Sequence, residues 1–149
     1  MDKKQLTETS LPMKAPSSGS CPFCSLPDVR VVHENGFAVV IRDAFPVTAG
    51  HTLVLPRRHL GSFFELDRHE RDAMFDLLAV ARDALDREFK PAGYNIGIND
   101  GQAAGQTIAH LHVHLIPRSI GDRADPRGGV RWIFPERADY WSTRDCEPN

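Results

Sequence analysis

The sequence lacks the features that mark membrane proteins and general nucleic-acid binders. No apolar run in its 149 residues approaches the ~20 residues that a membrane-spanning helix needs. Charge is nearly balanced, with 18 basic and 20 acidic side chains and a formal net charge of −2. Without a broad positive field, the chain has little attraction for nucleic acid or an anionic membrane surface. We therefore expect no nucleic-acid or membrane partner, and only local recognition of any phosphate group.

Cysteine is scarce, with three residues at Cys21, Cys24 and Cys146. No apolar segment follows Lys3 and Lys4, as it would in a secretory signal. The odd cysteine count and this missing segment favour a reduced, cytoplasmic setting over a disulfide framework. The pair in "CPFC" has the spacing of zinc ligands, but the chain lacks a second Cys-x-x-C. Taken alone, the pair fits a redox centre, half of a zinc site, or chance.

The length corresponds to one domain with a flanking segment at each end. Residues 1–20 are polar and interrupted by prolines, which predicts a flexible N-terminal tail. We expect residues 21–118 to form the domain itself. Residues 119–149 are rich in glycine, proline and charge. We expect them to form a C-terminal extension that packs on the domain.

Hydrophobic periodicity predicts one long helix among short strands. Asp67 stands at an N-cap position with Glu70 three residues later, the capping-box pattern, and Pro91 ends the helical spacing. The long helix is therefore expected at Arg68–Phe89, and a short helical turn at 57–66. Apolar alternation and turn signals predict the strands Val29–His33, Phe37–Arg42, His51–Pro56, Tyr94–Asp100 and 110–117. Short connections between most of these elements predict an α+β fold with an antiparallel sheet of about five strands.

The run "HLHVHLIPR" (110–118) has histidine at every second position. Alternate side chains of a strand share one face, so we expect His110, His112 and His114 to point one way and the apolar residues between them to face the core. Partly exposed polar residues would also give this pattern, but packing alone does not call for imidazole three times. The main alternative is a zinc hydrolase site, since histidines two apart on a strand can bind one zinc ion.

The preceding loop, "GQAAGQT" (101–107), favours phosphate chemistry. Its glycines leave backbone amides free to face an anion, and Thr107 adds a hydroxyl. Neutral imidazole has a pKa of about 6.5, so it is a competent nucleophile toward phosphorus near neutral pH. The loop and the histidines together predict attack on a phosphoryl group, with no metal required in the chemical step.

The runs "NDGQAAGQTIAHLHVHLIPR" and "GHTLVLPRRH" resemble the histidine triad (HIT) family of nucleotide hydrolases and transferases, and the likeness covers residues 21–118. The resemblance implies a HIT-like fold and cleavage at the α-phosphate of a nucleoside phosphate, either a dinucleoside polyphosphate or a nucleoside phosphoramidate. It implies a covalent histidine–nucleoside monophosphate intermediate. A purine nucleotide, adenosine by default, is the implied partner, together with a second copy of the chain. The alternative is a nucleotide-binding regulatory or scaffold protein with little turnover.

The resemblance also implies roles for individual residues. His112 matches the nucleophile, and His114 matches the residue at the leaving atom. Thr107 and the amide of Gly105 match the phosphate-binding turn, to which Gln106 also contributes.

Further positions match the binding site for the nucleoside. Asn99 corresponds to a residue that touches phosphate or ribose, and His51 to a histidine near the active site. Asp43 matches an acidic residue that holds the ribose hydroxyls, which suits a charged acceptor. Phe23 and Ile41 are candidates to line an apolar slot for the base.

Bacterial members of the family often carry a cysteine pair like "CPFC". In them the pair and two histidines hold a structural zinc. Carried onto this chain, the implied metal ligands are Cys21, Cys24, His59 and His110. Such a zinc would pin the N-terminal segment onto the sheet.

Overall fold

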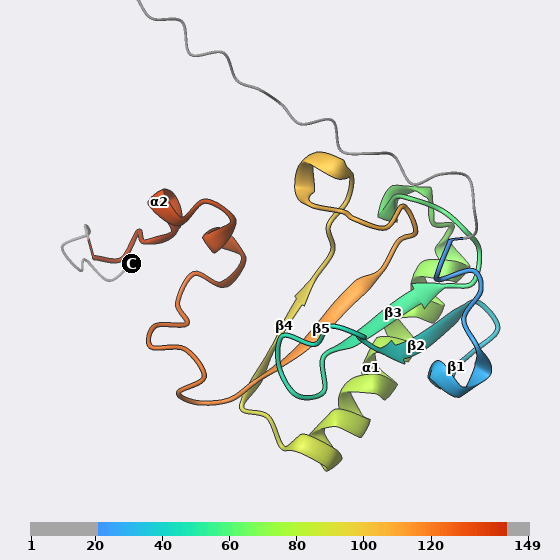
Figure 1. Ribbon diagram of the computed structural model, residues 1–149, viewed down its shortest axis with the longest axis horizontal. Coiled ribbons are helices and arrows are strands. Elements are labelled where there is room, and N and C mark those ends of the chain that lie inside the picture. The colour runs from blue at the N-terminus through green and yellow to red at the C-terminus, as the bar shows by residue number, and fades with distance from the viewer. Residues whose placement is uncertain (1–20, 143–149) are drawn as a thin grey trace, which may run out of the picture.

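The computed structural model describes residues 21–142, so the predicted tail at 1–20 and Cys146 lie outside the described residues. Five strands form one antiparallel sheet in the order β1-β2-β3-β5-β4, with the long helix α1 across one face (Figure 1). The strands are β1 (Val31–Glu34), β2 (Ala38–Arg42), β3 (Thr52–Pro56), β4 (Gly93–Gly97) and β5 (Val113–Arg118). The helices are α1 (Arg68–Phe89) and the short α2 (Pro135–Ala138), with 3-10 turns η1 (Asp28–Arg30), η2 (Phe63–Glu65), η3 (Gln102–Ala104) and η4 (Gly129–Ile133). The predicted α+β class is confirmed.

The long helix begins and ends where its local signals predict. The Asp67 side chain accepts the Glu70 N–H at 2.9 Å, and the Glu70 carboxylate accepts the Asp67 N–H at 3.0 Å. Both oxygens of this buried Glu70 carboxylate also accept from the Arg58 guanidinium at 2.7 Å. At the other end Lys90 adopts a left-handed conformation with φ 48°, directly before Pro91. The helix is thus closed by contacts within a few residues of each end.

Strands β2 and β3, inside the sheet, are buried on both faces. On one face, the buried stripe of α1 packs against the apolar residues that alternate with the histidines: Met74, Leu77, Leu78, Ala81, Leu85, Leu111, Val113 and Leu115. On the other face, Val39, Ile41, Leu53 and Leu55 are covered by Phe23, Leu26 and Val31 from the N-terminal part of the domain. Each fully buried aliphatic side chain contributes about 1.5–3 kcal/mol. The N-terminal segment is therefore part of the core on the histidine side.

The predicted fifth strand is wrong at its start, since β5 begins at Val113 rather than at residue 110. Pairing of β3 with β5 runs from Thr52↔Leu115 to Val54↔Val113 and stops there. Beyond that point the Leu111 N–H donates to the Leu60 carbonyl at 2.7 Å, so residues 110–112 leave the ladder. Smaller differences affect the other four strands: β1 begins two residues later than predicted, β2 and β3 each begin one residue later, and β4 runs from Gly93 to Gly97.

Residues 119–142 continue from β5 as an extension that holds η4 and α2 (Figure 1). The Arg127 guanidinium lies 4.7 Å from the Trp141 ring centroid, and that of Arg131 lies 4.8 Å from the ring centroid of Tyr140. These contacts join the extension to itself, and its packing on the domain stays a prediction. Within residues 21–142, no helix is both long and apolar enough to span a membrane.

Candidate functional site

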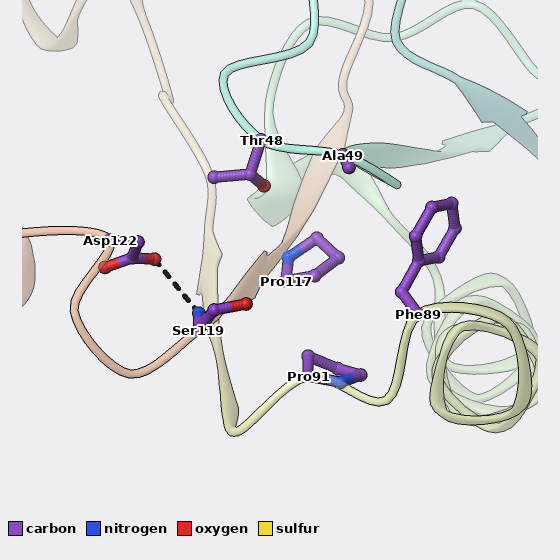
Figure 2. A pocket seen from close by; sticks show the side chains of 7 residues that line it. All are labelled: Thr48, Ala49, Phe89, Pro91, Pro117, Ser119 and Asp122. Carbon is purple, nitrogen blue, oxygen red and sulfur yellow. Dashed lines mark hydrogen bonds between the residues drawn. The ribbon is translucent and has the colours of Figure 1, made fainter.

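A hollow at the end of α1 does not carry the chemistry predicted from the sequence. It lies between the loop before β3, the C-terminal end of α1 and the end of β5 (Figure 2). Its lining residues are Thr48, Ala49, Phe89, Pro91, Pro117, Ser119 and Asp122. The one acidic group there, Asp122, is already paired with Arg118 and accepts the Ser119 N–H. With no histidine or cysteine in its lining, this hollow is not the candidate site.

The histidines gather on the face of the sheet opposite α1, where β3 and β5 pair. The His112 and His114 rings lie 4.9 Å apart between centroids. His51, directly before β3, places its Nε2 3.0 Å from Nδ1 of His114. Among the triad, His110 is fully buried and His112 is 7% exposed, whereas His114 is partly open to solvent. The expectation that the intervening apolar residues face the α1 side is confirmed.

The ring of His112 is held in one tautomer by its own chain. Nδ1 of His112 lies 2.9 Å from the backbone carbonyl of His110. A carbonyl oxygen can only accept, so Nδ1 carries the proton and donates it. The other nitrogen, Nε2, is left with a lone pair. A buried imidazole with a free lone pair at a defined nitrogen can act as a nucleophile.

A second chain of hydrogen bonds orients His114. The Val47 N–H points to Nδ1 of His51 at 3.3 Å, and because an N–H can only donate, this nitrogen is the acceptor. Nε2 of His51 therefore carries its proton and donates to Nδ1 of His114. His114 then keeps its own proton on Nε2. Asp43 Oδ2 lies 3.4 Å from Nδ1 of His51, where it would accept a proton if His51 became charged.

Burial keeps the imidazoles of His51 and His114 neutral. Desolvation, together with the neighbouring His112 and His51 and against the Asp43 carboxylate, lowers the pKa of His114 to about 4. Desolvation also lowers the pKa of His51, although the Asp43 carboxylate opposes the change. Removing a charged ring from water costs free energy, so the neutral forms dominate. His114 is consequently a neutral hydrogen-bond donor through Nε2 at physiological pH.

The triad as three ligands of one metal ion does not fit the geometry of the described residues. Each Nδ1 has a different partner: cysteine sulfur for His110, a backbone carbonyl for His112, and His51 for His114. A second group, Asp43, His51 and His114, has ligand atoms within 4.8 Å of one another. However, His51 offers opposite ring nitrogens to the two other residues, which describes a hydrogen-bond chain rather than a cage around an ion.

The glycine-bearing turn differs from the expectation of free amides. The Gly105 N–H donates to the Gln102 carbonyl at 3.0 Å, and the Gln106 N–H to the Gly101 carbonyl at 3.2 Å. The Gln106 side chain is also engaged, accepting the Gly101 N–H and donating to the Gly61 carbonyl, both at 2.8 Å. These groups hold the turn itself closed. Thr107 is exposed, and neither its hydroxyl nor its amide bonds to another of residues 21–142.

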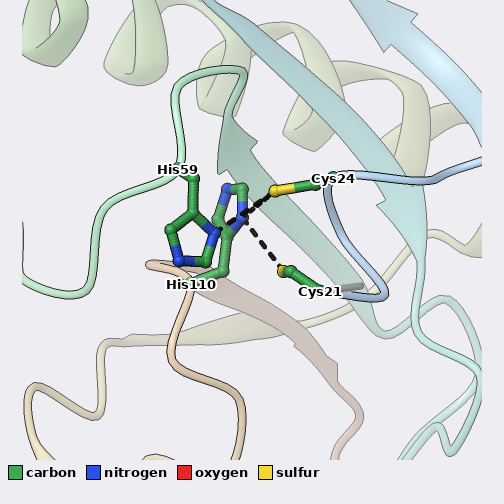
Figure 3. A group of neighbouring side chains, drawn as sticks. All are labelled: Cys21, Cys24, His59 and His110. Atoms are coloured by element: carbon green, nitrogen blue, oxygen red, sulfur yellow. Dashed lines mark hydrogen bonds between the residues drawn. The ribbon is translucent and has the colours of Figure 1, made fainter. Parts of the chain in front are cut away.

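Four residues from three parts of the chain, including His110 of the triad, meet on one side of the sheet (Figure 3). Cys24 Sγ lies 3.2 Å from His59 Nδ1, and Cys21 Sγ lies 3.4 Å from His110 Nδ1. Cys24 Sγ is also 3.5 Å from the same His110 nitrogen. Tetrahedral zinc binds sulfur and nitrogen at about 2.0–2.3 Å, which places its ligand atoms roughly 3.3–3.8 Å apart. The three sulfur–nitrogen distances are close to that range.

The protonation pattern of this group also suits a metal. Nε2 of His110 lies 2.9 Å from the Pro56 carbonyl and must donate to it, so Nδ1 turns a lone pair toward the sulfurs. Metal-bound histidines commonly donate their other N–H to a carbonyl in this way. Desolvation and the adjoining Cys21 raise the pKa of the Cys24 thiol, so binding of a cation would displace protons.

The remaining predicted residues are more scattered. Asn99 is exposed in the loop after β4, and Asp43 follows β2 with Oδ1 accepting the Phe45 N–H at 2.9 Å. Ile41 is 1% exposed and belongs to the core, whereas Phe23 is partly buried beside the histidines. Two participants were missed in the sequence: the Val47 amide and the Pro56 carbonyl. Backbone groups leave no residue-type signal.

Comparison with known proteins agrees with this geometry. Residues 27–120, more than half of the chain, match the HIT domain model. The chain belongs to the HIT domain family. This HIT domain is 36% identical over 110 residues to an uncharacterized HIT-like protein of Mycoplasma genitalium, a match covering 71% of this chain and 78% of that protein.

Two solved structures are similar in fold. A zinc-bound histidine triad family protein from Mycobacterium smegmatis has 34% identity and a TM-score of 0.63, covering 71% of this chain and 80% of that one. The Plasmodium falciparum diadenosine triphosphate hydrolase, solved with cyclomarin A, has 27% identity and a TM-score of 0.63. That match covers 65% of this chain and 66% of the hydrolase. The HIT-like fold predicted from the motifs is thereby confirmed.

Proposed function

We propose that this HIT domain is a nucleotide hydrolase or nucleotidyl transferase that acts at the α-phosphate of a nucleoside phosphate. The observation that carries the proposal is the 2.9 Å bond from His112 Nδ1 to the His110 carbonyl, which leaves a lone pair on Nε2. The similarity to a diadenosine triphosphate hydrolase supports a dinucleoside polyphosphate as substrate. A nucleoside phosphoramidate is the second substrate class, because the same attack serves a P–N bond. The nucleoside is adenosine by default.

In the first step, the lone pair on Nε2 of His112 forms a bond to the α-phosphorus. The bond to the leaving group breaks, and the leaving atom keeps its electron pair. Nε2–H of His114 donates a hydrogen bond to that atom, and Thr107 donates to a phosphate oxygen. A nucleotide leaving group is stable as an anion near neutral pH, whereas an amine must take up a proton, which a water molecule supplies. Donors that are already oriented stabilise the charge as it develops.

In the second step, water or another acceptor attacks the same phosphorus and gives up its proton to the solvent. The P–N bond to His112 breaks, its electron pair returns to Nε2, and the nucleoside monophosphate is released. Asp43 keeps Oδ2 for the ribose hydroxyls while Oδ1 accepts the Phe45 N–H. Asn99 contacts phosphate or ribose, and Phe23 lies at the base side. Gly105 and Gln106 act indirectly, by holding the turn that presents Thr107.

We also propose a structural zinc ion held by Cys21, Cys24, His59 and His110. The tetrahedral distances and the lone pair on His110 support it, as does a zinc-bound relative. When bound, zinc would cross-link the N-terminal segment to the sheet and take no part in the chemical step. Zinc uptake should release protons from the thiols, detectable with a pH dye in weak buffer, and C21S should abolish stoichiometric uptake. Uptake of an equal amount by C21S would contradict this assignment.

A homodimer is the proposed assembly. The outer edge of β4 has no neighbouring strand within the described residues, and Ile96 on it is 51% exposed. Open strand edges are prone to pair with another chain, so edge-to-edge pairing with α1 alongside would satisfy their hydrogen bonds.

The nucleophile is tested by rapid quenching with radiolabelled dinucleoside polyphosphate and adenosine phosphoramidate. We expect an acid-labile adduct on His112 during turnover. H112N should lower kcat by a factor on the order of 10³ or more and retain binding of the nucleoside monophosphate. H69Q, an exposed change on α1, is the matched control and should leave kcat unaltered. Nucleotide binding with no adduct and no turnover would instead identify a nucleotide-binding scaffold protein.

A further inference from the structure

We propose that the Cys21–Cys24 turn is a positioning element for the nucleophile, and that oxidation of its two thiols to a disulfide slows the attack by His112. The proposal rests on the proposed function, because it assigns the regulation of that same site. Two contacts join the turn to His112: one runs through His110 and the other through Phe23.

The first contact runs through His110, whose ring and whose backbone carbonyl are both hydrogen-bonded. The ring of His110 is fully buried between the two cysteine sulfurs and the Pro56 carbonyl. Its own carbonyl accepts the Nδ1–H of His112 at 2.9 Å. A shift of the His110 ring therefore moves the oxygen that fixes the tautomer of the nucleophile. Loss of that bond allows the proton to occupy Nε2, where it removes the attacking lone pair.

The second contact is aromatic. Phe23 stands between the two cysteines, and its ring meets both histidines edge to face. The centroid distances are 5.8 Å to His110 and 5.4 Å to His112, with interplanar angles of 84° and 71°. This arrangement is the favourable one for two aromatic rings. Phe23 thus limits rotation of the His112 ring.

Few other bonds hold the turn in place. Among residues 21–142, its one backbone hydrogen bond is internal, from the Cys24 N–H to the Cys21 carbonyl at 3.1 Å. The polar contacts that reach the rest of the domain come from the two sulfurs. Turning the sulfurs toward each other removes these contacts together with both thiolate ligands of a bound zinc. Phe23 is then held by apolar packing alone.

The oxidation is a two-electron step with hydrogen peroxide as the oxidant. Each thiol loses one proton and one electron, a sulfur–sulfur bond forms, and the peroxide is reduced to two water molecules. Cys-x-x-C spacing permits such a bond, and a dithiol reductant reverses it. A zinc ion at this site would leave, since two of its four ligands are consumed.

The test compares reduced and peroxide-treated protein in a C146S background, which confines thiol oxidation to the pair. Mass spectrometry should show the loss of two hydrogen atoms, and a chelating dye should report the release of any zinc. We expect single-turnover adduct formation to slow by about 10–100-fold, the range found when partners of a buried ligand histidine are removed. The ring nitrogen NMR shifts of His112, measured without substrate, should move toward the Nε2–H tautomer. Reduction with dithiothreitol should restore the single-turnover rate and the His112 NMR shifts.

Two variants separate positioning from loss of folding. F23L keeps the thiols and the apolar packing but removes the ring edge, so it should shift the His112 tautomer in reduced protein. The doubly substituted C21S/C24S protein should show no further change on peroxide treatment. An intact disulfide with the His112 shifts and the single-turnover rate unchanged would overturn the inference, as would an unaltered tautomer in F23L. If reduced protein forms no adduct at all, the proposed function fails, and the NMR comparison still decides this inference.

Discussion

Protonation of His114 should oppose folding in mildly acidic solution. Burial lowers the pKa of His114 from 6.5 to about 4 in the folded protein, so the unfolded chain binds more protons between these values. Stability is therefore complete above pH 6.5 and falls as the pH drops toward 4. From the folded and unfolded pKa values, we expect the free energy of unfolding to be about 2 kcal/mol lower at about pH 5 than at about pH 7.5. The lowered pKa values of His51 and His110 act in the same direction, so the wild type should lose more.

The measurement is urea unfolding at these two pH values, with free energies of unfolding from linear extrapolation. H114N keeps an acceptor for the His51 N–H but cannot titrate, so its loss should be smaller than that of the wild type by about 2 kcal/mol. H69Q, on the exposed face of α1, should lose as much as the wild type. Equal losses in the wild type and H114N would show that burial of His114 does not couple its protonation to folding.

Two further predictions concern the frame that carries the site. G50A should cost about 2–4 kcal/mol, because Gly50 has φ +83° and an added Cβ would lie 2.9 Å from side-chain carbons of α1. G36A, with nothing within 4 Å of its Cβ, is the control, and a similar cost in both would refute the steric argument. D67A removes the acceptor of the Glu70 N–H and should cost about 1 kcal/mol in urea unfolding. D72A, exposed on the same helix, should cost less than D67A, and the reverse order would count against the cap.

The features that could be predicted from the sequence depend on neighbours in the chain. The bounds of α1 follow from Asp67, Glu70 and Pro91, each within four residues of a helix end. The alternation of Leu111, Val113 and Leu115 placed these side chains on the α1 face because strand periodicity is a local property. The four candidate metal ligands were predicted from the resemblance to the family. The spacing of Cys21 and Cys24 alone had left three interpretations open.

What could not be predicted depends on backbone groups far apart in the chain. The Pro56 carbonyl meets the ring of His110 across 54 positions, and the start of β5 is delayed by a bond from Leu111 to Leu60. Every residue carries such groups, so no residue type signals which of them will be used. The prediction of free backbone amides in the turn at 101–107 was wrong for a related reason. Its glycines do allow positive φ, but the amides close the turn on itself instead of facing outward.

The same backbone groups explain why the three histidines of the triad carry their protons on different ring nitrogens. An imidazole has two equivalent choices for its proton in solution, and the chain removes that choice at each position. The Pro56 carbonyl turns the lone pair of His110 toward sulfur, and the His110 carbonyl leaves the lone pair of His112 on Nε2. The Val47 amide, acting through His51, leaves His114 with a proton to donate. One residue type thus supports the three proposed roles of ligand, nucleophile and donor, because each ring has a different hydrogen-bond partner.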